Sequence, residues 1–266
     1  VRHDLTWPEE FMCLAIGVGV FLTLRGLYDR VPLLMAAPTA IIAAYVGWKA
    51  LRVLRERDVV FARAQLRRGG RLTLAGAAFM LSTALALALL VHSAAVRVLV
   101  LRAGGHDARV TVSFQDALGQ VNVSQRDRAS AEQGARLYRL AGPWWRGGIG
   151  LDLTPEASTR AAWLRLVGGD PKGAIEELNA LHDGGRASDQ NTADLAFLLA
   201  RGGDRAAAER VLRDAVAARP AFSLSREQLA GLMIEDGRAA EAVGMLEARV
   251  AARPTDALAR VGLARV

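Results

Sequence analysis

The sequence has a single cysteine, Cys13, among its 266 residues, and only two lysines, Lys49 and Lys172. One cysteine excludes an intrachain disulfide and any zinc site or cluster held by four cysteines. The four histidines are scattered and form no H-E-x-x-H pair, the spacing that places two zinc ligands on one helix face. The histidines are His3, His92, His106 and His182.

Motifs for catalysis are also missing. Gly17-Val18-Gly19 and Gly147-Gly148 neither follow a strand nor open a helix, as a dinucleotide-binding or phosphate-binding loop requires. No serine stands in a G-x-S-x-G setting. We interpret Glu176-Glu177 as a solvated face of an amphipathic helix. The sequence therefore predicts that the chain is not an enzyme and that it has no cofactor and no metal site.

Charge is unevenly distributed along the chain, whose formal net charge is +7. Residues 49–71 contain eight basic residues against Glu56 and Asp58, a net of +6. Residues 155–254 contain 13 basic and 15 acidic residues, a net of −2. A nucleic-acid-binding face would need basic residues displayed on the folded domain. The basic block instead lies between apolar runs, which favours a membrane topology signal and no nucleic-acid partner.

Three apolar runs predict a membrane domain over residues 1–96. The clearest, residues 72–96, carries no formal charge and is longer than the roughly 20 residues needed to cross a bilayer. Further spans are predicted near 7–28 and 31–48. A buried helix of a soluble core is the alternative for the third run, and a signal-peptide core is the alternative for the first.

The basic loop orients these predicted spans. Short loops rich in Lys and Arg stay in the cytoplasm, so residues 49–71 are expected there. The third span then leads outward. We therefore expect an integral protein of the bacterial inner (cytoplasmic) membrane whose C-terminal half faces the periplasm.

Residues 97–154 form a predicted connector. Alternation over 109–114 and 120–123 is compatible with a small hairpin across 115–119, or with an extended linker. A helix is expected over 130–140. The pair Trp144-Trp145 is expected either to touch the membrane surface or to pack on the next domain, and the sequence leaves both open.

A period of 34 residues organises residues 155–266. Glycine-containing triplets, predicted to be turns, begin at Gly168, Gly202 and Asp236. Small residues recur before the turns, and an alanine and a leucine recur after them. These are Ala162, Ala196 and Ala230 before the turns, and Ala174, Ala208, Ala242, Leu178, Leu212 and Leu246 after them. This spacing suits stacked helical hairpins, in which small residues allow close approach and leucines fill the space between pairs.

This pattern resembles the tetratricopeptide repeat family. The resemblance covers 155–188, 189–222, 223–256 and a partial fourth unit, with Pro220 and Pro254 as closing prolines. It departs from the family in lacking the early aromatic and the tyrosine before the turn, and in having Arg249 where alanine is usual. Arg186 replaces the closing proline of the first unit. The expected fold class is all-α: transmembrane helices followed by an α-solenoid of helix-turn-helix repeats.

The resemblance implies a concave face that binds peptides or helices. Carried over to this sequence, the inward row contains Trp163, Phe197 and Gly231, with Arg201 and Glu235 near its edge. The alternative is that Trp163 and Phe197 only pack between neighbouring helices.

Three hypotheses for function follow. The first is a membrane-anchored interaction scaffold that binds a protein or peptide and contacts lipid. The second is the C-terminal part of a membrane-bound 4Fe-4S electron-transfer protein with its clusters upstream of residue 1. It is prompted by a weak resemblance of residues 25–32 and 65–73 to such proteins. The third is an assembly factor or structural subunit. Because residue 1 is Val and residue 266 falls within an expected helix, we also expect a fragment of a longer chain.

Overall fold

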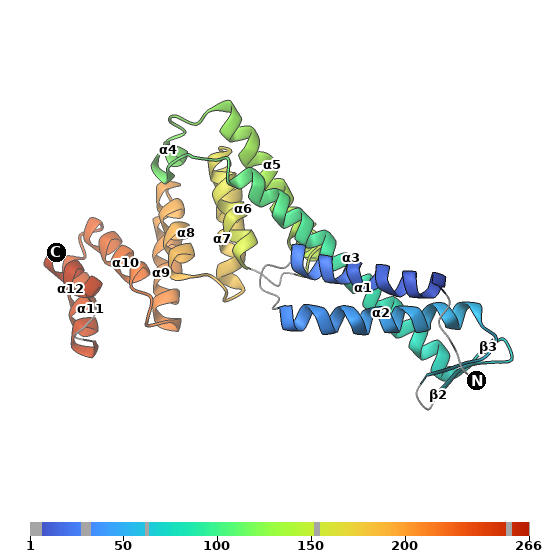
Figure 1. The fold of residues 1–266 in the computed structure, drawn as a ribbon. Coiled ribbons are helices and arrows are strands. Elements are labelled where there is room, and N and C mark those ends of the chain that lie inside the picture. The colour runs from blue at the N-terminus through green and yellow to red at the C-terminus, as the bar shows by residue number, and fades with distance from the viewer. Residues whose placement is uncertain (1–6, 28–32, 62–63, 152–154, 254–256, 266) are drawn as a thin grey trace. The chain divides into compact units, whose positions relative to one another are not determined.

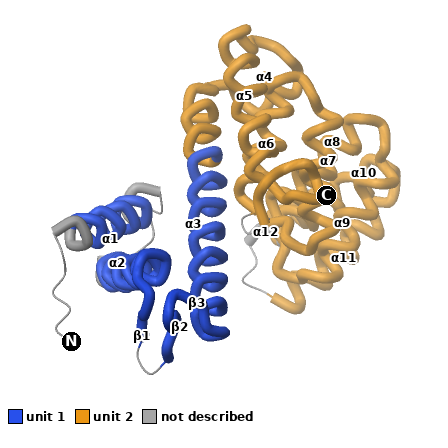
Figure 2. Tube along the Cα trace, turned by 90° about the vertical axis from the view of Figure 1, so that its right-hand side faces the viewer, with its two compact units in different colours: residues 1–99 blue, residues 100–266 orange. Residues whose placement is uncertain are grey.

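The computed structural model describes residues 7–27, 33–61, 64–151, 155–253 and 257–265 (Figure 1). The protein is mostly helical, at 77% of the chain, and neighbouring helices pack on one another in sequence order. It divides into two compact units, Val1–Leu99 and Val100–Val266 (Figure 2). Each unit is described separately below.

In the first unit, helices α1 (Trp7–Leu27) and α2 (Leu33–Arg55) pack side by side. Glycine permits the close approach, because a Cβ atom on Gly47 would lie 2.9 Å from the Ile16 side chain. Many large apolar side chains of the pair are exposed, including Phe11, Ile41 and Ile42. These helices occupy the regions of the first two predicted spans, while residues 28, 31 and 32 lie outside the described residues.

The predicted basic loop contains a small antiparallel sheet, which departs from the expected all-α fold. Its strands are β1 (Val59–Phe61), β2 (Ala64–Arg68) and β3 (Arg71–Leu72), in that order. Gly69 and Gly70 join β2 to β3 with positive φ angles of 54° and 83°, as a two-residue hairpin turn requires. Val59 and Leu66 are buried with Val53 of α2. The sequence did not predict this sheet, because basic residues dominate the segment and only three buried apolar residues form the core of the sheet.

Helix α3 (Leu74–Asp107) follows the sheet directly and is 34 residues long. The Thr73 hydroxyl accepts a hydrogen bond from the Gly76 amide at 3.0 Å and caps its first turn. The predicted span began at residue 72 and ended at 96, but residue 72 belongs to β3 and the helix continues for another eleven residues past Val96, as the range to Asp107 shows. No helix breaker follows Arg97 until Gly104, so the helix carries on.

Among the described residues, α3 is the one helix long and apolar enough to cross a membrane. Only 6% of its most apolar window is buried within the protein. A helix that is apolar on all sides and so little covered by protein is typical of a membrane span rather than of a soluble core. The apolar part of α1, Phe11–Leu24, is shorter than that of α3.

The second unit begins with the end of α3, followed by α4 (Phe114–Gly119), α5 (Gln125–Ala141) and the 3₁₀ turn η1 (Trp144–Arg146). The hairpin predicted across residues 109–123 is wrong: residues 109–113 have no regular structure and α4 takes the place of its turn. The physical reason is capping. The Ser113 and Ser124 hydroxyls accept hydrogen bonds from the Asp116 and Asp127 amides, each at 3.1 Å, and start α4 and α5.

The rest of the second unit is a series of antiparallel helices that pack in sequence order (Figure 1). They are α6 (Pro155–Val167), α7 (Pro171–Asp183), α8 (Asp189–Arg201), α9 (Arg205–Ala218), α10 (Leu224–Glu235), α11 (Ala239–Ala252) and α12 (Ala257–Arg265). The hairpins α6–α7, α8–α9 and α10–α11 fall on the 34-residue period. The closing residue Pro254 lies outside the described residues.

Burial follows the predicted register closely. The alanines and leucines that recur every 34 residues are all at most 4% exposed, from Ala162 in the first hairpin to Leu246 in the third. The predicted turns are also present, since Gly169, Gly203 and Gly237 have φ angles of 83°, 92° and 78°. A side chain is strained in that left-handed region, which explains the recurring glycine.

Polar side chains join successive hairpins. The Asp189 carboxylate, at the start of α8, accepts hydrogen bonds from the amides of Ser223, Leu224 and Ser225 at 2.9 Å each. It also accepts one from the Ser225 hydroxyl at 2.6 Å. The residue before α10, Ser223, makes no side-chain cap of its own. Asp189 therefore caps the first helix of the following hairpin.

The last turns of α3 are fixed to α5 and α6. Gly134 of α5 lies against α3, where an added Cβ would be 3.3 Å from the His106 Cβ. The Arg160 guanidinium donates two hydrogen bonds to the buried Asp107 carboxylate, at 2.5 and 2.6 Å. Burial, with the nearby Asp107 charge, raises the pKa of Tyr138. Helix α3 thus ends inside the core of the second unit.

Candidate functional site

A groove with a volume of about 470 Å³ lies between α8 and α10 in the second unit. We call it the α8–α10 groove. It contains four of the five residues predicted from the repeat register. Its lining comprises Ala196, Phe197, Ala200, Arg201, Arg205, Gln228, Gly231, Leu232 and Glu235.

Glycine 231 leaves the middle of the groove open. A Cβ atom built on it would meet no atom within 4 Å. The neighbouring surface is apolar, with Phe197 40% exposed and Leu232 half-buried. The groove therefore offers room for one large apolar side chain of a partner.

Trp163, the fifth predicted residue, lies outside the groove. Phe114 of α4 stacks on it, with ring centroids 6.2 Å apart, and also contacts Phe197 at 5.9 Å. The Gln120 side chain then donates a hydrogen bond to the Leu166 carbonyl of α6 at 3.0 Å. Helix α4 thus packs against α6 at Trp163. Phe114 was missed because it comes from the connector, outside the repeat register.

The rim of the α8–α10 groove carries both charges. Arg205 pairs with Glu235 at 2.8 Å and with Asp236 at 3.0 Å, and its hydrogen bond to Glu235 raises the pKa of the guanidinium. The Arg201 side chain is exposed and makes no ion pair or hydrogen bond with any residue that the structure describes. The groove therefore has an unpaired guanidinium, that of Arg201, next to the apolar surface of Phe197 and Leu232.

One carboxylate on α8 is held in an unfavourable setting. Burial raises the pKa of Asp194, and the hydrogen bond that Gln190 donates to it at 2.7 Å only partly opposes that shift. In the 34-residue register Asp194 corresponds to Gln228, which lines the groove. Because its pKa is raised in the folded state, this carboxyl makes the stability of α8 depend on pH.

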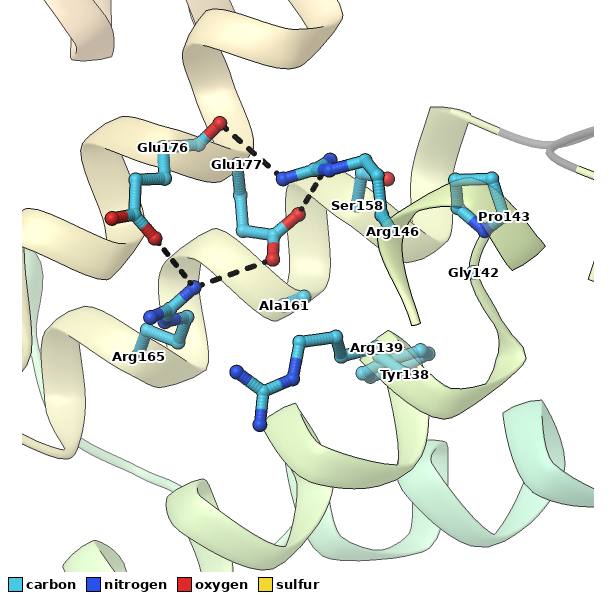
Figure 3. A pocket seen from close by; sticks show the side chains of 10 residues that line it. All are labelled: Tyr138, Arg139, Gly142, Pro143, Arg146, Ser158, Ala161, Arg165, Glu176 and Glu177. Atoms are coloured by element: carbon cyan, nitrogen blue, oxygen red, sulfur yellow. Dashed lines mark hydrogen bonds and ion pairs between the residues drawn. The ribbon is translucent and has the colours of Figure 1, made fainter. Parts of the chain in front are cut away.

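A second, smaller cavity of about 170 Å³ lies between α5, α6 and α7 (Figure 3). The Glu177 side chain is buried between two guanidinium groups there, 3.1 Å from Arg146 and 3.4 Å from Arg165. Glu176 lies 3.5 Å from Arg165. The interpretation of both glutamates as a solvated face is wrong for Glu177, which is 4% exposed. Its partner Arg146 comes from the loop after α5.

Backbone geometry sets the position of Arg165 in this cluster. A Cβ atom on Gly173 would lie 1.9 Å from the Arg165 guanidinium carbon, so only glycine allows that stacking. Burial pushes the pKa of Asp170 upward, but hydrogen bonds from the Gly173 amide and Arg165 outweigh it and lower the pKa. With its charges paired, the cluster joins α5, α6 and α7 and serves packing.

No protein-family model matches the chain, and a search of curated proteins gives no match. Among the residues that the structure describes, no three His, Cys, Asp or Glu side chains come together as metal ligands. The site is therefore characterised by its geometry alone: an apolar groove with one unpaired arginine at its rim.

Proposed function

We propose that the protein is a membrane-anchored scaffold or assembly factor whose helical repeats, of the tetratricopeptide type, bind a protein or peptide partner. The observation that carries this proposal is the α8–α10 groove. Phe197, Arg201, Gly231 and Glu235 line it together, and the resemblance assigns all four to a partner-binding face. The 34-residue register and the buried small residues support the repeat assignment.

The anchoring half of the proposal rests on α3. Its length, its uncharged sequence from Leu74 to Val96 and its outward-facing leucines support insertion into a bilayer. We extend this to three spans by including α1 and α2, with residues 49–71 in the cytoplasm and the repeats in the periplasm of a bacterium.

The groove also indicates the chemistry of the partner. Open space at Gly231 beside Phe197 suits a large apolar side chain. The unpaired Arg201 suits a carboxylate close to that side chain, because Arg205 is already paired with Glu235. We therefore expect a segment that combines an apolar anchor with an acidic group.

Photo-crosslinking in membranes of the source organism tests this proposal. A benzoyl-phenylalanine replacing Phe197 is expected to form a discrete adduct with a partner, and the same residue replacing the exposed Arg210 of α9 is the control. Arg201→Glu should lower the yield at position 197 about tenfold, because it places like charges together. The matched Arg210→Glu should leave it unchanged. Equal labelling at 197 and 210, or indifference to Arg201→Glu, would contradict the groove as the binding surface.

A further inference from the structure

The loop after α5 displays two tryptophans to solvent. In this loop, residues 142–151, which we call the tryptophan loop, Trp144 is 65% exposed and Trp145 58% exposed. The rings meet edge to face with centroids 5.9 Å apart. Neither ring is covered by the first repeat, so packing on that repeat does not account for them. Leu140, Ile149 and Leu151 add exposed apolar surface beside them.

The tryptophan loop is built so that these rings stay outside. The Ile149 amide donates to the Leu140 carbonyl at 2.8 Å, and the Gly150 amide donates to the Gly142 carbonyl at 2.7 Å. A Cβ on Gly148 would lie 2.2 Å from the Gly142 oxygen, and one on Gly150 would lie 2.1 Å from the Ala141 oxygen. These contacts fold the backbone of the loop tightly on itself, and the two rings lie exposed on its outside.

The position of the loop follows from α5. Within the second unit, α5 runs antiparallel to the last turns of α3 (Figures 1 and 2). Gly134 lies against Ala103 and His106, and α5 continues for seven more residues, to Ala141. The tryptophan loop therefore lies toward the Val100 end of this part of α3. The sequence immediately before that end is the apolar run that closes at Val96.

Tryptophan suits the boundary between lipid and water. Its ring is apolar while its N–H needs a polar partner, and it is enriched at membrane interfaces together with basic residues. Arg136 and Arg139 of α5 are exposed close to the loop, and Arg97 flanks the apolar run. In water the apolar faces of two exposed indoles stay hydrated, which is unfavourable. At the headgroup level lipid covers these faces and the N–H groups still find polar partners.

We propose that the tryptophan loop inserts into the headgroup region of the leaflet from which α3 emerges, as a second, peripheral membrane contact. This rests on the proposed anchoring by α3. Lipid would cover Trp144 and Trp145, and the repeats would be held against the bilayer surface at the end of α5 as well as through α3.

Environment-sensitive labels in the full chain test the proposal. In a Cys13→Ala background, single cysteines replace Leu151 in the loop, Leu85 in α3 and Ala217 on α9, and each carries a nitrobenzoxadiazole group. The protein is reconstituted into vesicles of phosphatidylcholine and phosphatidylglycerol that contain lipids spin-labelled near the headgroup or deep in the acyl chain. We expect the label at 151 to lose most of its fluorescence with the headgroup quencher, the label at 85 with the deep quencher, and the label at 217 with neither.

The outcomes separate the two proposals. Quenching at 85 without quenching at 151 would overturn the loop contact and leave the anchor intact. An absence of quenching at both positions would overturn the anchor itself. Replacing both tryptophans by alanine should reduce quenching at 151 and leave quenching at 85 unchanged. Undiminished quenching at 151 in that variant would show that the tryptophans do not hold the loop in lipid.

Discussion

Leucine has opposite surroundings in the two units of this protein. In the first unit Leu81, Leu85 and Leu87 of α3 are mostly exposed, whereas in the second unit Leu164, Leu195 and Leu212 are completely buried. Both segments are helical and both are rich in alanine and leucine. What differs is the spacing: the second unit repeats its leucines every 34 residues on matching faces, and α3 places them all around its axis. Composition alone therefore does not predict whether the leucines of a helix are buried or exposed, but their spacing does.

The largest effect is expected from removing a buried leucine of the second unit. Leu195→Ala should destabilise that unit by about 4 kcal/mol, since the side chain is 0% exposed and its loss leaves a cavity. Leu85→Ala in α3, where the residue is 60% exposed, is the matched control and should have little effect. Thermal unfolding of the full chain in mild detergent measures both. A similar loss of stability in the two variants would contradict the difference in leucine burial between the two units.

The reverse test places a charge in α3. Leu85→Arg should disfavour membrane insertion by about 3 kcal/mol, because an arginine near the bilayer centre is poorly solvated. The second unit would then stay in the cytoplasm, and alkaline phosphatase fused to its C-terminus, which is active only in the periplasm, would lose activity relative to the parent fusion. Leu101→Arg, beyond the apolar run, is the control. Full phosphatase activity in both variants would argue that α3 does not span.

A smaller effect is expected at the link between hairpins. Asp189→Ala removes the acceptor of three amides and one hydroxyl at the start of α10, and should destabilise the second unit by about 2 kcal/mol. Asp189→Asn, which keeps one acceptor oxygen, should lose less. Amide hydrogen exchange should show the loss concentrated at residues 223–225. Uniform loss across the unit would mean that the cap is not local.

The smallest effect concerns Asp194, whose pKa burial raises. A carboxyl with a folded pKa above its unfolded value favours the folded state at low pH, and that contribution is lost as the pH rises through the folded pKa. Asp194→Asn keeps the acceptor for Gln190 and should be more stable than the parent at pH 7, by about 0.5 kcal/mol. The difference should vanish well below the unfolded pKa of about 3.9, where the parent carboxyl is protonated in both states. Denaturant titrations at several pH values measure it, and a difference that persists at low pH would contradict the assignment.

Sequence reasoning succeeded where contacts are local. In a series of stacked hairpins each helix touches its sequence neighbours, so the spacing of Ala208 and Leu212 already places them in the core. The positive φ of Gly203 follows for the same reason. The same register brought Phe197 and Gly231 into one groove.

It failed where a contact joins distant segments. Nothing in the alternation over 109–123 shows that Ser113 starts a helix and that Phe114 then covers Trp163. Burial of Glu177 depends on Arg146, about thirty residues earlier in the chain. The sheet was missed because its signal, Gly69-Gly70 between short alternating segments, was read only for its charge.

Helix α4 makes the two ends of the α8–α10 groove different. By covering Trp163 with Phe114, it closes the face on the side of α6 and leaves it open from Phe197 onward. A partner segment of the kind proposed above, entering from α10, would meet Phe114 next to Phe197. The proposed binding surface would therefore suit a chain terminus or a bend, and its closed end is formed by a residue outside the repeats.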